Sequence, residues 1–301
     1  MLPQSRNEAI LAERLAELDG QVHRLWTVTS VRTTTLGAAV TASDVNGASA
    51  TVQARYVVGA DGLNSVVRTG AGIGFSGDNY HSSFVLADIQ LDWPLPIDEV
   101  QLFFSPGGLV VAAPLPGGRH RVVATADQAP EAPSAELVQS LLTERGPGGA
   151  HVGELVWSSR FRVQHRVAEA YRNGKLVLAG DAAHVHSPAG GQGMNTGIQD
   201  AIDLGHTLTS VLTGQAADTA LDGYQQRRRP VAEQVVRLTH RATRLATLQG
   251  RASRTGRNLA VAVASRIPAV QRRIAIQIAE LHNRRSNLSN ARTELALGRT
   301  G

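Results

Sequence analysis

The chain has 301 residues, of which 42% are hydrophobic and 4% aromatic, and its formal net charge at pH 7 is +5. This length allows one large or two modest domains, whereas no apolar run approaches the roughly 20 residues that a membrane-spanning helix needs. Because the sequence contains no cysteine, disulfides, thiol nucleophiles and Cys-ligated metal centres are excluded. The N-terminus lacks the basic flank and apolar core of a signal peptide, so we expect a cytoplasmic protein without a membrane partner.

The first 70 residues are predicted to form a helix, a group of strands and a buried parallel strand. Ser5-Arg6-Asn7-Glu8 matches a capping box, and apolar residues continue at helical spacing to Leu18. Three strand-like runs follow, with a tight turn at Asn46-Gly47 between the last two. These runs cover residues 22–31, 38–42 and 48–54. The apolar run Tyr56-Val57-Val58 is typical of a buried parallel strand, and it leads into Gly59-Ala60-Asp61-Gly62.

Residues 75–161 are predicted to form a second, mainly antiparallel sheet region. Clusters of Pro and Gly separate strand-like runs, and one helix is predicted over 134–145. The predicted strands cover residues 84–91, 100–104, 109–113, 121–126 and 155–161. The chain then returns to the first domain through an apolar strand over 175–179.

That strand begins the most informative segment, because a Gly-rich turn and a helix over 194–212 follow it. Asp181 stands immediately after the Gly at the end of this strand, where a carboxylate can accept hydrogen bonds from sugar hydroxyls. Glycines let the backbone approach a ligand closely, and a helix start favours negative charge. A turn or capping role for Asp181 is the alternative. However, the segment that follows Asp181 contains several glycines at the start of a helix, where each costs up to ~1 kcal/mol in helix propensity. A polar cofactor therefore explains the glycine content better than a structural role does.

The chain from Leu221 onward is predicted to be helical, with breaks at Pro230, Gly250, Gly256 and Pro268. The basic run Arg227-Arg228-Arg229 lies just before the first break. We interpret it as a solvated helical face and not as a nucleic-acid surface, because aromatic residues are scarce and the excess arginine is spread along the last third.

Two motifs in this order resemble those of the FAD-dependent aromatic-ring hydroxylases, the class A flavoprotein monooxygenases similar to p-hydroxybenzoate hydroxylase. Gly180-Asp181 resembles the Gly-Asp motif that contacts the ribityl or pyrophosphate part of FAD. The segment from Pro188 to Asn195 resembles the loop that lies along the isoalloxazine ring. Gly59-Ala60-Asp61-Gly62 with Arg68 resembles the Asp-Gly motif that helps to hold FAD and NADPH.

The resemblance implies a monooxygenase in which NAD(P)H reduces FAD and O2 supplies the oxygen atom transferred to a small aromatic substrate, phenolic or polyketide-like. It identifies no catalytic residue. The cofactor-binding residues that it implies are Gln4, Asp61, Gly62, Arg68, Gly180, Asp181, Pro188, Gly190, Gly191, Gly193, Met194 and Asn195.

The implied fold class is α/β: a partial FAD-binding, Rossmann-like domain with an inserted, mainly antiparallel substrate sheet and C-terminal helices. Residues 1–72 and 165–220 are predicted to form the two parts of the FAD-binding domain. Residues 73–164 form the substrate domain, and 221–301 the helical region. Whether the chain forms a homodimer is left open at this point.

The sequence departs from the family at its start, because no G-x-G-x-x-G unit precedes Gln4. Gly72, Gly74 and Gly77 have that spacing, but they open into strands and are interpreted as a crossing between domains. One alternative is therefore a non-redox relic that acts as a small-molecule binder or cyclase-like protein. Others are a partner chain that supplies the missing unit, and nucleic-acid binding. His184 and His186 are interpreted as loop histidines near a cofactor, since no third metal ligand is apparent.

Overall fold

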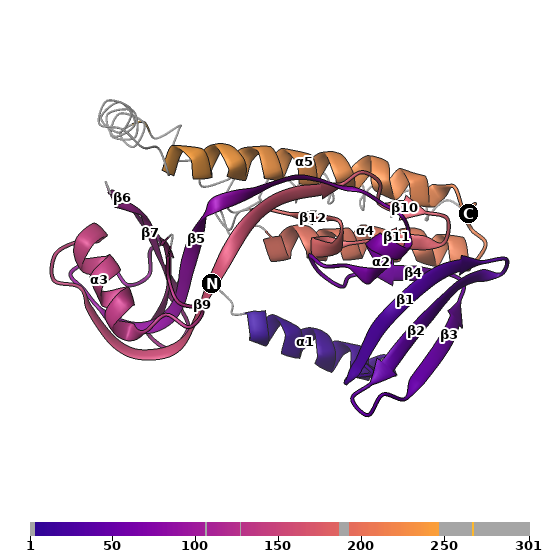
Figure 1. The fold of residues 1–301 in the computed structure, drawn as a ribbon, viewed down its shortest axis with the longest axis horizontal. Coiled ribbons are helices and arrows are strands. Elements are labelled where there is room, and N and C mark those ends of the chain that lie inside the picture. The colour runs from indigo at the N-terminus through magenta and orange to yellow at the C-terminus, as the bar shows by residue number, and fades with distance from the viewer. Residues whose placement is uncertain (1–3, 106, 127, 187–192, 247–266, 268–301) are drawn as a thin grey trace, which may run out of the picture.

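The computed structural model describes residues 4–105, 107–126, 128–186, 193–246 and 267. A sheet that wraps around a short helix lies at one end of the molecule, and an arm made of a helix and a three-stranded sheet lies at the other (Figure 1). Two long strands and two long helices connect these ends. Within the described residues, none of the helices combines the length and apolar character that crossing a bilayer requires.

The arm contains α1 (Gln4–Glu17) and the antiparallel meander β1-β2-β3. The strands are β1 (Trp26–Thr34), β2 (Gly37–Asp44) and β3 (Ser49–Ala54). Asp44 closes the predicted turn, because its carboxylate accepts the backbone N–H groups of Asn46 and Ala48, and Gly47 adopts a φ of 83°. Helix, strands and turn are therefore confirmed, although the first strand starts four residues later than predicted.

A small sheet of order β10-β11-β4 carries the parallel pair that the sequence predicts. β4 (Val57–Gly59) lies parallel to β11 (Leu176–Leu178), and β10 (Arg172–Asn173) is antiparallel to β11. α2 (Val66–Gly70) follows β4, whereas the short helix η1 (Gly180–Ala182) and β12 (His184–Val185) follow β11. Segments 119 residues apart in the sequence are thus neighbours, and their turns share one sheet edge.

The second region is a six-stranded antiparallel sheet of order β12-β9-β5-β8-β7-β6. Its strands are β5 (Phe75–Asp92), β6 (Gln101–Ser105), β7 (Gly108–Leu115), β8 (Arg119–Thr125) and β9 (His151–Ala168). α3 (Ala135–Arg145) starts at Ser134, whose side chain accepts the N–H of Leu137, and packs its apolar face on the sheet. Gly72 and Gly74 lead directly into β5, which confirms that this G-x-G-x-x-G spacing opens a strand.

Two long helices complete the fold: α4 (Gly193–Leu212) and α5 (Ala220–Ala246). The predicted break at Pro230 is wrong, because Pro230 lies inside α5. Contacts just before the proline hold the helix in place: Arg228 binds Asp200 of α4, and the Nε of Arg229 donates to the carbonyl of Ala168 at 3.1 Å. Tertiary packing here overrides the usual cost of about 3 kcal/mol for an interior proline. The breaks predicted at Gly250, Gly256 and Pro268 lie outside the described residues.

The basic run in α5 is not the solvated face that we predict from the sequence. Arg228 is only 8% exposed and pairs with Asp200, while Arg227 pairs with Asp203, also on α4. The run therefore joins the two helices, and its charge is largely used within the fold.

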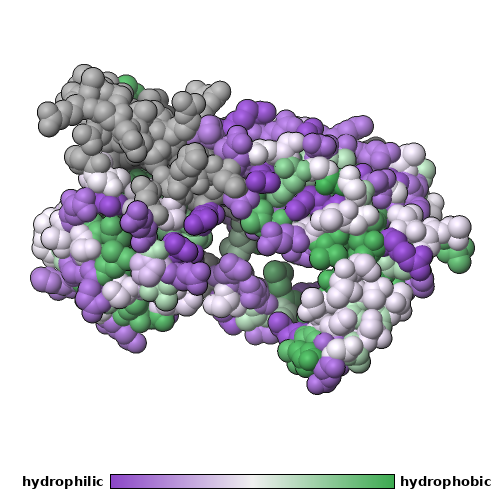
Figure 2. All heavy atoms as spheres, in the orientation of Figure 1, coloured by the Kyte–Doolittle hydropathy of each residue, from purple (hydrophilic) through white to green (hydrophobic). Residues whose placement is uncertain are grey.

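α1 presents an apolar stripe that no described residue covers. The side chains of Ile10, Leu11 and Leu15, and of Leu18 just after the helix, are 38–64% exposed, and no residue of α1 is buried. The outer edge of β4 pairs with no described strand, and Val58 on it is 40% exposed, so this parallel strand is not buried as predicted. On the face drawn in Figure 2, the molecule is open between the body that holds α4 and the arm of α1 and β1–β3.

Candidate functional site

The two predicted motifs meet at the carboxyl ends of the parallel strands β4 and β11. Leu178 lies opposite Gly59 in the register, and the N–H of Ala179 donates to the carbonyl of Gly59 at 3.0 Å. Parallel strands end at the same sheet edge, so the turns that follow them are brought together. The Asp61 turn and the Asp181 turn are consequently neighbours.

Gly180 begins the second turn in a conformation that favours glycine. Its φ is 60°, in the left-handed region, and the carbonyl of Gly180 accepts the N–H of Ala183 at 2.8 Å. A Cβ atom on Gly197 of α4 would lie 3.4 Å from the Cα of Gly180, so helix and turn approach closely. Asp181 then points outward: it is exposed, and no hydrogen bond or ion pair joins it to another described residue.

Asp61 and Gly62 form the matching turn after β4. One carboxylate oxygen of Asp61 accepts the N–H of Val67 at 3.1 Å, and the hydroxyl of Ser65 accepts the N–H of Arg68 at 2.8 Å. Both side chains thus cap α2. Gly62 has a φ of 79°, and a Cβ added there would meet nothing within 4 Å. This backbone is strained for other residues and open to a ligand, which is compatible with the predicted cofactor role.

Arg68 connects the two motifs through hydrogen bonds to the turn that follows each strand. Its guanidinium donates to the carbonyl of Ala182 at 2.9 Å and to the carbonyl of Leu63 at 2.6 Å, and it lies over the Phe75 ring at 3.9 Å from the centroid. Burial lowers the pKa of Arg68 below its ordinary value. The structure therefore gives Arg68 a structural task, while its contact with a cofactor stays a prediction.

The first turn of α4 lies close to the first turns of α1. The amide of Asn7 donates to the Sδ of Met194 at 3.7 Å, and Met194 and Asn195 are exposed. Gln4, one turn before Asn7, is exposed, and its amide donates to Glu8 at 2.8 Å. The start of α4 thus contacts α1 at Asn7, one turn after Gln4, whereas Pro188, Gly190 and Gly191 lie outside the described residues.

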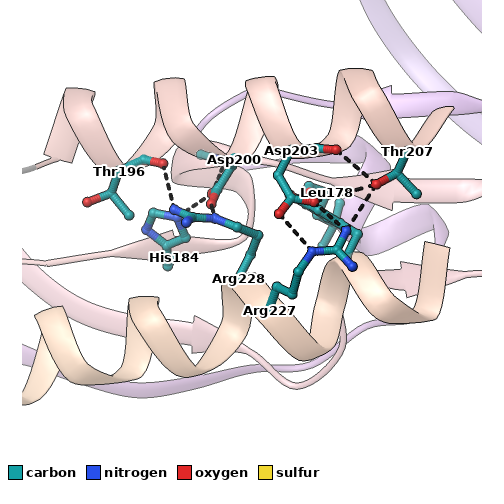
Figure 3. Close-up of polar contacts among 10 residues, drawn as sticks. Leu178, His184, Thr196, Asp200, Asp203, Thr207, Arg227 and Arg228 are labelled. Atoms are coloured by element: carbon teal, nitrogen blue, oxygen red, sulfur yellow. Dashed lines mark hydrogen bonds and ion pairs between the residues drawn. The ribbon is translucent and has the colours of Figure 1, made fainter. Parts of the chain in front are cut away.

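A buried polar network beneath the second turn was not predicted from the sequence (Figure 3). Asp200 of α4 is 0% exposed and accepts from the N–H of Gly180, from His184 and from Arg228. His184 is 1% exposed, so it is a core residue and not the loop histidine that we expected. One sequence signal could have located Asp200: it occupies the buried stripe of α4 with Thr196, Leu204 and Val211, where an acid is unexpected.

The chemistry of these turns fits the flavin nucleotide that the resemblance implies. Asp181 offers a carboxylate that no described residue engages, at the edge of a Gly-rich turn, and such a group accepts hydrogen bonds from ribityl or ribose hydroxyls. Gly62 and Gly180 hold positive φ values that bring bare backbone to the same edge. At the start of α4, Met194 offers an exposed apolar side chain and Asn195 an exposed polar one. This combination suits contact with the flavin ring, which has both apolar and polar parts.

Comparison with known proteins gives the same assignment. A family described as the FAD binding domain matches residues 1–239. The 6-methylpretetramide 4-monooxygenase of Streptomyces rimosus is 41% identical over 255 residues, which are 83% of this chain and 45% of that protein. The solved structure of OxyS anhydrotetracycline hydroxylase from Streptomyces rimosus has a TM-score of 0.74 and 33% identity, and the match covers 93% of this chain and 56% of that one.

One further relative carries a different activity in its name. The dialkyldecalin synthase of Streptomyces rugosporus is 34% identical over 232 residues, which are 75% of this chain and 49% of that protein. The chain thus spans about half the length of the curated relatives that it matches.

Proposed function

The chain belongs to the FAD-binding family of flavin-dependent aromatic hydroxylases, and on that premise we propose that it is the flavin- and substrate-facing part of a monooxygenase that hydroxylates an aromatic molecule. The substrate class is phenolic or polyketide-like, the reductant is NAD(P)H and the oxidant is O2. The observation that carries the proposal is the meeting of the Asp61 and Asp181 turns at the carboxyl ends of β4 and β11.

In this proposal each part of the site has one task. Asp181 and the Gly180 backbone bind the sugar part of FAD, and the turn formed by Asp61 and Gly62 binds FAD at a second point. Gly193, Met194 and Asn195 face the ring, and the N–H groups at the start of α4 favour negative charge beside it. When bound, FAD supplies the electron transfer from NAD(P)H and the activation of O2, so one oxygen atom enters the ring and the other leaves as water. The six-stranded sheet covers the substrate and excludes solvent.

The test is flavin retention. The chain is expressed, mixed with FAD and desalted, and its visible spectrum is recorded; a retained flavin band supports the proposal. Asp181→Ala should abolish that retention, whereas Asp98→Ala, an exposed acid in a loop of the sheet region, should not. Equal flavin titrations for Asp181→Ala and the unsubstituted chain would show that the site is elsewhere. NADPH oxidation with phenolic substrates then tests the activity.

A second candidate, a non-redox binder or cyclase-like protein, is favoured by one observation. The dialkyldecalin synthase shares 34% identity with this chain, so the same sequence family also includes a protein that is not named as a monooxygenase. A folded, colourless protein that retains an aromatic or polycyclic ligand would support this candidate. The prevalence of aromatic monooxygenases among the relatives favours the first.

A further inference from the structure

Asp200 makes contacts that packing of α4 against α5 does not require. Its Oδ2 accepts the N–H of Gly180 at 3.1 Å and lies 2.7 Å from the Nε2 of His184, while its Oδ1 accepts the Nε of Arg228 at 2.7 Å. These three partners come from the turn after β11, from β12 and from α5 (Figure 3). One buried carboxylate therefore holds three separate segments together.

The charges in this network are fixed by their surroundings. Burial opposes the ionisation of Asp200, but the hydrogen bonds from His184 and Arg228 outweigh it, so the pKa of Asp200 lies below its ordinary value. An ionised carboxylate can only accept hydrogen bonds, so the Nε2 of His184 carries the proton in this contact. The His184 ring also stacks on the buried ring of Tyr171, with centroids 6.3 Å apart. The acceptor that faces Gly180 is consequently held in one place.

The turn that Asp200 reaches is the one that presents Asp181. Gly180 adopts the left-handed conformation, and its N–H is the group that Asp200 binds. We propose that Asp200 is a positioning residue for flavin binding, which fixes the Gly180 amide and so holds the Asp181 carboxylate at the orientation that the nucleotide needs. This inference rests on the proposed function and deepens it.

α4 and α5 provide a matched control for this role. Asp203 lies one turn after Asp200 and binds Arg227, the residue before Arg228, through contacts of 2.9 and 2.6 Å. The two Asp–Arg pairs therefore join the same two helices (Figure 3). Asp203 otherwise contacts Thr207 on its own helix and no residue of the Gly180 turn. Its side chain is 22% exposed, against 1% for Asp200.

The first experiment compares Asp200→Asn with Asp203→Asn in the flavin-free protein by amide hydrogen exchange. We expect exchange of the Gly180 amide to be at least about tenfold faster in Asp200→Asn, because its acceptor loses charge and alignment. Exchange should change less than about twofold in Asp203→Asn. Equal exchange rates in the two variants would overturn the proposal, since Asp200 and Asp203 would then both serve only to join α4 to α5.

The second experiment measures the dissociation constant of FAD by fluorescence titration, at a temperature where far-UV circular dichroism shows both variants folded. Asp200→Asn should weaken FAD binding by about tenfold or more, while Asp203→Asn should leave it unchanged. Unchanged affinity in Asp200→Asn would overturn the proposal. If the unsubstituted chain binds no FAD, the proposed function fails, but the exchange experiment still decides whether Asp200 positions the turn.

A second pair of variants covers the case in which Asp200→Asn does not fold. Arg228→Lys and Arg227→Lys both keep the positive charge, but lysine cannot reproduce the Nε contact that orients the Asp200 carboxylate. Arg228→Lys should accelerate exchange at Gly180 and weaken FAD binding, whereas Arg227→Lys should change neither. Equal effects of the two substitutions would overturn the proposal.

Discussion

The guanidinium of Arg68 donates to the carbonyl of Ala182 at 2.9 Å, although 114 positions separate the two residues in the sequence. This bond ties the turn after β4 to the turn after β11. Arg68 also satisfies the carbonyl of Leu63, so its removal leaves two acceptors near the sheet edge without a donor. Since both candidate motifs depend on this edge, Arg68 is an obvious first target for mutation.

We expect Arg68→Met to lower the free energy of unfolding by about 2–3 kcal/mol, because hydrogen bonds from charged donors contribute about 1.5–3 kcal/mol and the acceptors stay partly buried. Urea denaturation followed by circular dichroism measures this change. Arg55→Met is the control: Arg55 also donates to a carbonyl, that of Leu212, but from an exposed position, so its removal should cost less than about 1 kcal/mol. Equal losses would contradict the structural role of Arg68.

Gly180 and Gly197 face each other but should respond differently to alanine. Gly180→Ala forces a residue with a Cβ into a left-handed backbone, at a cost of about 1–2 kcal/mol. Gly197 lies inside α4, where alanine gains up to about 1 kcal/mol in helix propensity, and its Cβ would make only ordinary contact at 3.4 Å. Thermal unfolding should therefore show a lower Tm for Gly180→Ala and an equal or higher Tm for Gly197→Ala. The opposite order would mean that space, and not backbone conformation, requires glycine here.

The sequence predicted most of the fold because its elements carry local signals. The helix predicted over 134–145, the Asn46-Gly47 turn and the apolar strand of Val57 and Val58 all appear where their patterns indicate. The family resemblance, which rests on Asp61 and Asp181, is confirmed by the comparisons. The cofactor contacts of these two residues stay predictions.

What the sequence did not predict depends on long-range contacts. Arg228 looks like one charge in a basic run until α4 places Asp200 beside it, and Pro230 looks like a break until packing holds α5 continuous across it. His184 likewise becomes a core residue only through its bond to Asp200. Each of these features needs a partner at least 16 residues away, and local periodicity contains no such information.

The apolar stripe of α1 should tolerate polar substitution in this chain. Leu11 is 58% exposed, so Leu11→Gln should change the free energy of unfolding by no more than about 0.5 kcal/mol. Leu142→Ala in α3 is the contrast: Leu142 is 0% exposed, and its truncation should cost about 2–5 kcal/mol. Urea denaturation measures both. A cost well above 1 kcal/mol for Leu11→Gln would show that another part of the protein, or a second copy, covers the stripe.

Asp218 should make stability depend on pH at the junction of the small sheet and α5. Lys175, Tyr56 and Arg172 all donate to its carboxylate. The hydrogen bond from Lys175, followed by that from Tyr56, lowers the pKa of Asp218 below its ordinary value. A carboxylate with a depressed pKa stabilises the fold at pH values above the pKa that the same Asp side chain has in the unfolded chain, about 3.9. This contribution disappears as the pH falls toward the depressed pKa of the folded state.

We therefore expect Asp218→Asn to lose about 1 kcal/mol at pH 7, a modest value because the side chain is 39% exposed and solvent screens its pairs. The difference from the unsubstituted chain should stay constant down to about pH 5 and shrink as the pH falls further, since the unfolded chain then binds a proton that the folded Asp218 carboxylate does not. Urea denaturation at several pH values measures it. Asp222→Asn is the control: Asp222 shares the partner Arg172 but is 59% exposed, so its substitution should cost less at pH 7 than that of Asp218. A loss that persists unchanged at pH 3 would show that Asp218 stabilises the fold through its shape and not through its charge.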